Sequence, residues 1–105
     1  MKFKMNNRTW EIVEAEPEYL LQEYNNEFGD ISYCFGFTKI SDQKICINKE
    51  LCQDQKKQTL YHELMHCYIW CYIHNFDEIG IEALCDISAN SHDIIHKIVE
   101  DYFKE

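Results

Sequence analysis

The chain is poor in the two residues that most often interrupt secondary structure, since its 105 residues include only one proline and three glycines. Together with 46% hydrophobic residues, this composition is typical of a folded globule and argues against disorder. The length allows one modest hydrophobic core. We therefore expect residues 1–105 to form a single domain.

Positive charge is also scarce, because 10 Lys and Arg residues stand against 19 Asp and Glu residues, for a net charge of −9. Nucleic acids and anionic membranes bind basic surfaces, so neither is an expected partner. The sequence has no apolar run of about 18 residues that could span a membrane, and residues 1–8 lack the apolar segment of a signal peptide. We expect a cytoplasmic protein; the sequence predicts no particular oligomeric state.

The cysteines lack any C-x-x-C spacing, although there are six of them, at positions 34, 46, 52, 67, 71 and 85. Three disulfides would suit an exported protein, but without an export signal reduced thiols are expected. Cys67 and Cys71 are four residues apart in a predicted helix, where small buried residues fit. We interpret the thiols as structural; zinc held by cysteine is the alternative.

One five-residue motif carries most of the chemical information. His62, Glu63 and His66 form an H-E-x-x-H pattern, and residues four apart are neighbours on one face of a helix. Both imidazoles can therefore reach one Zn²⁺, while Glu63 points a step round the helix and can take a proton from an attacking water. The motif predicts a zinc cofactor held by His62 and His66, with Glu63 as the catalytic base.

Turn residues and hydrophobic spacing predict the order ββ-α-ββ-α-α, an α+β pattern. The expected elements are a hairpin of strands 3–5 and 9–13 around Asn6-Asn7, a helix at 16–28 ended by Gly29-Asp30, strands at 31–40 and 44–48, a helix at 55–73 capped by Asp54, and a helix at 81–103. Gly36, inside a strand, indicates a bulge or a close backbone approach.

The two C-terminal helices are expected to build the core. The helix that carries H-E-x-x-H has apolar residues on most sides, so we expect it to be buried nearly all round. The last helix has a predicted core stripe of Ile81, Leu84, Ser88, Ile95, Ile98 and Tyr102. The segment 90–93 is expected to kink or split this helix, with Ser91 as a new N-cap.

A catalytic zinc usually takes three protein ligands, so a third ligand is expected downstream of His66. Glu82 lies 16 residues later at the start of the next helix, which would pack antiparallel to the motif helix. Asp86 follows at i+4 and could hydrogen-bond a ligand histidine. The alternatives for the third ligand are His74, Asp86 itself and the pair His92 and His96. The plainer interpretation is that Glu82 and Asp86 are exposed acids at a helix start.

The segments T-L-Y-H-E-L-M-H at 59–66 and E-A-L-C-D at 82–86 resemble the gluzincin metallopeptidases. Within them the chain is most similar to small phage and mobile-element proteins related to the ImmA/IrrE family. The resemblance implies a minimal zincin-like fold, in which a small twisted β-sheet packs on the H-E-x-x-H helix and a C-terminal helix carries the third ligand. It also implies that His62, His66 and Glu82 bind zinc and that Glu63 is the base.

The sequence therefore predicts a zinc-dependent peptide hydrolase. Candidates to stabilise the oxyanion are Tyr33, Tyr68, His92 and His96. The strand Lys44, Ile45, Cys46, Ile47 and Asn48 is expected to be an edge strand that aligns a peptide or protein substrate by β-augmentation. The alternatives are a zinc-containing, non-hydrolytic protein-binding module of phage or mobile-element origin, and a metal-free structural domain.

Overall fold

The computed structural model describes residues 1–28, 34–73 and 80–104. Its elements are β1 (Lys2–Met5), β2 (Arg8–Ala15), α1 (Pro17–Phe28), β3 (Gly36–Lys39), β4 (Lys44–Asn48), α2 (Gln53–Tyr72) and α3 (Ile81–Lys104). The predicted order and the α+β class are confirmed. The expected helix end at Gly29-Asp30 and the first residues of the strand expected at 31–40 lie outside the described residues.

The four strands form one mixed sheet in the order β1-β2-β4-β3. β1 pairs antiparallel with β2 through a turn at Asn6 and Asn7, whose φ angles of 52° and 64° are the positive values that asparagine tolerates. β2 pairs parallel with β4, and β3 pairs antiparallel with β4. β3 therefore forms the sheet edge next to β4.

The prediction that residues 44–48 form an edge strand is wrong, because β4 lies between β2 and β3. Both of its faces are covered. Ile45 and Ile47 are fully buried on one face, and Cys46 is buried with Leu20 of α1 on the other. A strand covered on both faces belongs in the middle of a sheet.

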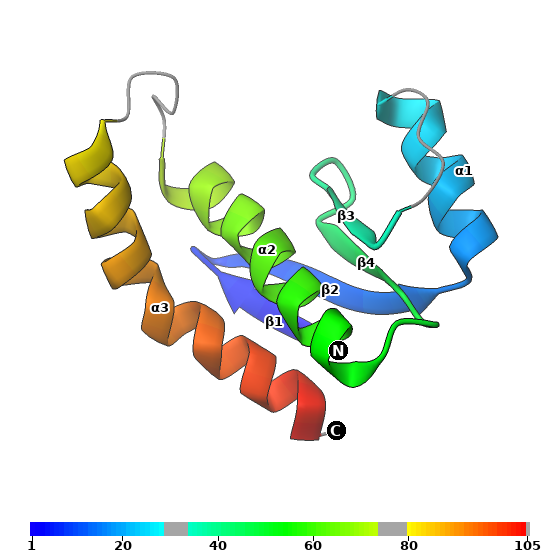
Figure 1. Ribbon diagram of the computed structural model, residues 1–105. Coiled ribbons are helices and arrows are strands. Elements are labelled where there is room, and N and C mark those ends of the chain that lie inside the picture. The colour runs from blue at the N-terminus through cyan, green and yellow to red at the C-terminus, as the bar shows by residue number, and fades with distance from the viewer. Residues whose placement is uncertain (29–33, 74–79, 105) are drawn as a thin grey trace.

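Helices cover the two faces of the sheet unequally (Figure 1). α2 lies across one face with α3 beside it, and α1 packs against β3 and β4 on the other face. The larger core, between the sheet and α2 and α3, includes Trp10, Ile45, Leu60, Leu64 and Val99. Among the described residues, no helix is long and apolar enough to cross a membrane.

α2 has one buried face and one exposed face, so the prediction of a helix buried nearly all round is wrong. Its buried residues are Thr59, Leu60, Glu63, Leu64, Cys67 and Cys71, as expected for the two cysteines. The helix begins at Gln53, and the N-cap is Cys52 rather than Asp54. The backbone N–H of Cys52 donates to Oε1 of Gln55 at 3.3 Å, which satisfies a donor at the helix start.

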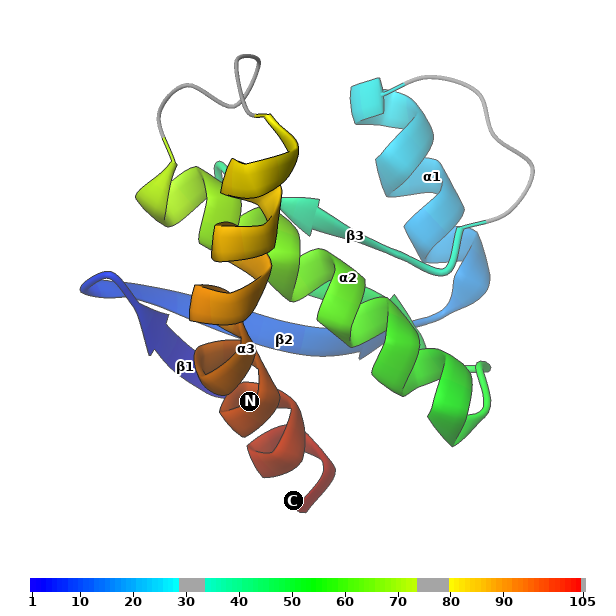
Figure 2. The same cartoon turned by 60° about the vertical axis from the view of Figure 1, so that its left-hand side comes forward.

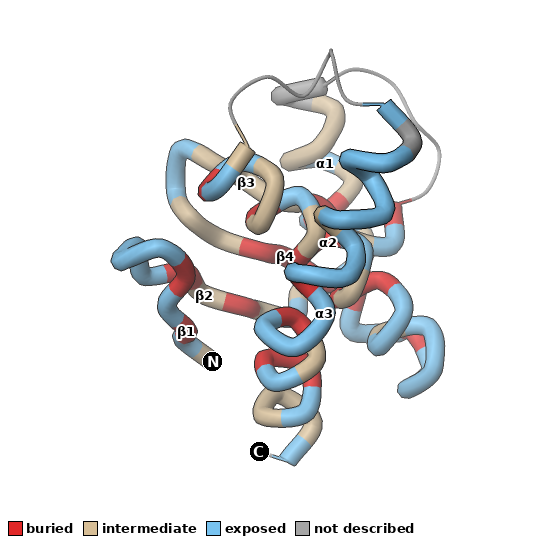
Figure 3. Tube along the Cα trace, turned by 90° about the vertical axis from the view of Figure 1, so that its left-hand side faces the viewer, coloured by how far each residue is buried: buried red, intermediate tan, exposed pale blue. Residues whose placement is uncertain are grey.

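α3 is one continuous helix, and the expected break at 90–93 does not occur. Ser91 does not cap a new helix; it is buried, and its hydroxyl donates to the backbone oxygen of Ser88 at 3.3 Å within α3. The second half packs through Ile95 and Val99, but Leu84 is 46% exposed. Ser88 is exposed as well, so the core stripe predicted for the first half is wrong at Leu84 and Ser88. Figure 2 shows that half in front of α2, and Figure 3 shows it coloured mostly as exposed.

Gly36 brings β3 close to both β4 and α2, as the sequence indicated. A Cβ atom at this position would lie 2.7 Å from the backbone oxygen of Cys46 and 2.9 Å from Cγ2 of Thr59. Both distances are shorter than carbon contacts allow. The absence of a side chain therefore lets the edge strand approach the helix that carries the motif.

Candidate metal centre

The motif residues lie at the middle of α2, on the side that faces the edge strand β3. His62 and His66 are exposed, whereas Glu63 is buried with 7% of its surface accessible. This difference follows from the helix, because successive residues are rotated by about 100°. The histidines point to solvent, and the glutamate is turned towards the sheet.

The two imidazoles have the spacing of zinc ligands. Their Nε2 atoms are 3.3 Å apart, and the ring centroids are separated by 4.9 Å. Two nitrogens each about 2.0–2.1 Å from a tetrahedral Zn²⁺ lie about 3.3–3.4 Å from one another. The separation of the His62 and His66 donor atoms therefore matches that of two ligands of one zinc ion.

The carboxylate of Glu63 lies beside this pair of imidazoles. One of its oxygens is near His62, and the other is held by a residue of β3. Oε2 is 3.9 Å from Nε2 of His62, which is too long for a direct hydrogen bond. Oε1 accepts a hydrogen bond of 2.9 Å from the hydroxyl of Thr38 in β3. Glu63 is thus close to the metal position without competing for it, which suits a base.

Two adjoining hollows flank the motif between α2 and β3, and both are lined by Gly36, His62 and Glu63. The hollow of about 460 Å³ extends towards the start of α2, with Gln55 and Gln58 in its lining. The hollow of about 830 Å³ extends towards the end of α2, with Ile69 and Trp70 in its lining. Together they form a groove beside α2 and β3 that passes His62 and Glu63.

The structure does not bring Glu82 to the histidines. Both Glu82 and Asp86 are exposed, and they lie in the first turns of α3, before its contacts with Met65 and Tyr61 of α2. Within residues 1–28, 34–73 and 80–104, no three His, Cys, Asp or Glu side chains form a metal-binding group.

Glu82 as third ligand and Asp86 as its partner therefore stay predictions. The alternative ligand His74 lies outside the described residues. The remaining alternative, His92 with His96, is a stacked pair with ring centroids 5.5 Å apart. Nδ1 of His96 lies 2.7 Å from the hydroxyl of Tyr61, and its Nε2 lies 2.9 Å from Glu100, so both ring nitrogens already have partners.

None of the three oxyanion candidates within the described residues lines the groove. Tyr33 lies outside the described residues, and His92 and His96 are on α3. Tyr68 contacts Tyr72 with ring centroids 4.8 Å apart and is not among the residues that line the groove. The strand expected to align a substrate, Lys44–Asn48, is enclosed by its neighbours, and β3 instead borders the groove.

Two contributors were missed by sequence reasoning. Thr38 hydrogen-bonds Glu63. Trp70 lines the larger hollow, and the guanidinium of Arg8 lies over its ring, 4.7 Å from the ring centroid. The alternation of polar and apolar residues in β3 could have placed Thr38 towards α2. No local signal pairs it with Glu63, because that contact depends on how the sheet meets the helix.

Two cysteines lie near the motif. Burial raises the pKa of the Cys67 thiol to about 12, and burial also raises the pKa of Cys34, which lines the smaller hollow. Both thiols are therefore neutral near pH 7, in keeping with structural roles.

No protein-family model, no curated protein and no solved structure matches the chain.

Proposed function

We propose that the protein is a zinc-dependent peptide hydrolase of the zincin type. The observation that carries the proposal is the 3.3 Å separation of the His62 and His66 Nε2 atoms, with the carboxylate of Glu63 beside them. These atoms reproduce two ligands and a base of an H-E-x-x-H site. The likeness to gluzincins related to the ImmA/IrrE family, and a cytoplasmic location, are part of the same proposal.

His62 and His66 would hold the zinc, with Glu82 as the proposed third ligand. Bound zinc would supply a Lewis acid, which polarises the scissile carbonyl and makes an attacking water easier to deprotonate. Glu63 accepts a proton from that water as its oxygen bonds to the carbonyl carbon. The same proton then passes from Glu63 to the amide nitrogen as the C–N bond breaks, which restores the carboxylate.

The groove supports a peptide as the substrate. β3 forms the sheet edge in the described part of the chain, and an extended peptide can add to such an edge through its backbone. The motif lies between the smaller hollow at Gln55 and Gln58 and the larger hollow at Trp70. A peptide lying along β3 would therefore pass directly over Glu63.

The substitution Glu63→Gln tests the mechanism. We expect wild-type protein to contain zinc and cleave a peptide library, and the variant to keep its zinc while losing about 100-fold or more of the cleavage rate. Metal analysis and mass spectrometry of the products give the two measurements. Glu50→Gln is the matched control, because Glu50 is exposed and is not a lining residue of the groove.

Undiminished cleavage by Glu63→Gln would refute the role of Glu63. Zinc-loaded wild type that binds peptides but cleaves none would instead favour a zinc-containing, non-hydrolytic binding module. One observation favours that alternative: two ligands, rather than three, are assembled within the described residues.

A further inference from the structure

Glu63 is the most buried residue of the proposed site. Its side chain is 9% exposed, whereas that of the neighbouring His62 is 70% exposed. A buried carboxylate is costly unless hydrogen-bond donors reach it. The hydroxyl of Thr38 is such a donor, at 2.9 Å from Oε1.

Thr38 belongs to a different element from Glu63, and its hydroxyl contacts two oxygens of Glu63. It lies in the edge strand β3, and its Oγ1 is 2.9 Å from Oε1 and 3.3 Å from the backbone oxygen of Glu63. A hydroxyl has one proton to donate, and a charged acceptor makes the stronger bond. The shorter contact to Oε1 is therefore the one that fixes the carboxylate.

The bond makes the two oxygens of Glu63 unequal. Oε1 is held by Thr38, while Oε2 is turned towards the metal side, 3.9 Å from Nε2 of His62. The terminal torsion of a glutamate is otherwise broad, with no sharply preferred angle. Without the hydroxyl, the carboxylate could turn away from the position where a water would be deprotonated.

We infer that Thr38 is a positioning residue for the reaction: it holds Oε1 so that Oε2 is the oxygen that accepts the proton. This inference rests on the proposed hydrolase function. It also gives the edge strand a second role, since β3 would orient the base as well as border the substrate. Correct placement of a catalytic group governs the chemical step more than binding of the ground state.

Thr38→Val and Thr38→Ser separate positioning from packing. Valine keeps the shape but removes the hydroxyl, and we expect kcat to fall about 10- to 100-fold with KM within about twofold of wild type. Serine keeps the hydroxyl and should restore most of kcat. Zinc affinity should be the same in all three proteins. Thr9→Val is the control, because it makes the same change at an exposed position of β2.

An unchanged kcat in Thr38→Val would overturn the inference, and so would equal losses in the valine and serine variants. A loss confined to KM would also overturn it, because it would mean that Thr38 contacts substrate rather than the base.

The contact itself can be tested without activity, by a double-mutant cycle in the zinc-free protein. The thermal midpoints of Thr38→Val, Glu63→Met and the double variant should be non-additive, because either single change removes the same bond. Additive midpoints with an active wild type would overturn the Thr38 contact alone. Non-additive midpoints with an inactive wild type would overturn the hydrolase function, and the catalytic role of Thr38 with it.

Discussion

At the scale of single residues, the three motif side chains depend on the fold to different degrees. His62 and His66 are brought together by one helix turn, so their 3.3 Å spacing needs only α2. Glu63 needs the neighbouring strand, because its orientation depends on Thr38. Glu82 belongs to another helix and is exposed. Local sequence therefore determines the spacing of the proposed ligand pair, and tertiary structure determines the orientation of Glu63.

Zinc titration of single variants tests the ligand set. His66→Ala should weaken zinc binding by more than about tenfold, and Glu82→Gln should also weaken it by about tenfold or more. Isothermal calorimetry or competition with a chromophoric chelator gives the affinities. The control is Glu18→Gln, since Glu18 is likewise an exposed acid in the first turn of a helix. Wild-type affinity in Glu82→Gln, beside a weakened His66→Ala, would remove Glu82 from the site.

At the scale of elements, the approach of β3 to its neighbours depends on one glycine. Gly36 leaves no room for a methyl group between β3, the backbone of Cys46 in β4 and the side chain of Thr59 in α2. The same strand carries Thr38 and lines both hollows of the groove. A shift of β3 would therefore alter the core packing and the site together.

Gly36→Ala should destabilise the protein by about 1–3 kcal/mol, because the added Cβ overpacks the contact with β4. Chemical denaturation followed by circular dichroism measures the free energy of unfolding. Gly80→Ala is the matched control, since a Cβ at Gly80 meets nothing within 4 Å. Equal stability of Gly36→Ala and Gly80→Ala would mean that β3 does not approach β4 as closely as described.

Sequence patterns predicted the helices and strands well, but they predicted less well which of these elements lie next to one another. The turn at Asn6 and Asn7 and the order of strands and helices depend on local chemistry, which the sequence carries directly. The central position of β4 could not be predicted, because alternation of Ile45 and Ile47 fits a half-buried strand equally well. Asn48 looks like an exposed residue but is fully buried, since its side chain hydrogen-bonds the backbone of Cys34 and of Glu50.

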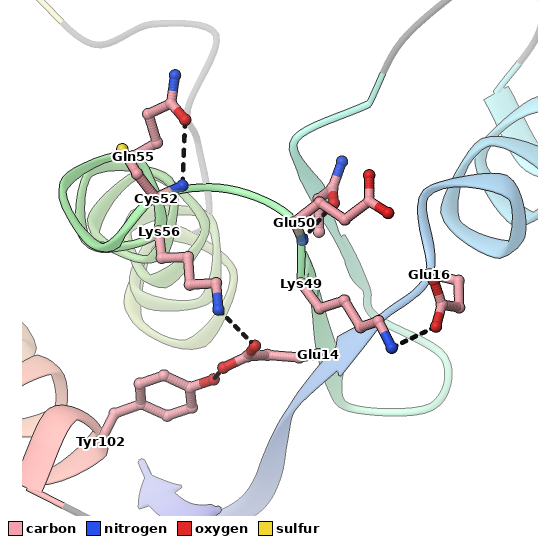
Figure 4. A network of polar contacts seen from close by, with 9 residues as sticks. Glu14, Glu16, Lys49, Glu50, Cys52, Gln55, Lys56 and Tyr102 are labelled. Carbon is pink, nitrogen blue, oxygen red and sulfur yellow. Dashed lines mark hydrogen bonds and ion pairs between the residues drawn. The ribbon is translucent and has the colours of Figure 1, made fainter.

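At the scale of the whole molecule, one carboxylate connects three elements. Glu14 of β2 accepts bonds from Lys56 of α2, at 2.7 Å, and from the hydroxyl of Tyr102 of α3 (Figure 4). Partial burial of Glu14 favours its neutral form. The bonds from Lys56 and Tyr102 outweigh that effect, so the pKa of Glu14 is lowered from its ordinary value. The network ties the C-terminal part of α3 to the sheet.

The lowered pKa makes this contribution to stability depend on pH. Because the pKa of Glu14 is lower in the folded than in the unfolded state, the contribution is present above the unfolded value and is lost as the pH falls through the folded value. We expect Glu14→Gln to have a lower thermal midpoint than wild type at pH 7, and the difference to shrink in acid. A difference that persists unchanged at about pH 3 would contradict this account.

The parallel pairing of β2 with β4 has a consequence for the order of folding events. It joins Glu11 to Lys44 and Ala15 to Asn48, and the partners in each pair are 33 residues apart in the chain. The segment that contains α1 and β3 must therefore form a loop before β2 and β4 can pair. Closing such a long loop is slow compared with forming a helix or a hairpin. Since β3 pairs with β4, we expect α2, which carries the two motif histidines, to form before β3 has reached its final place beside Glu63.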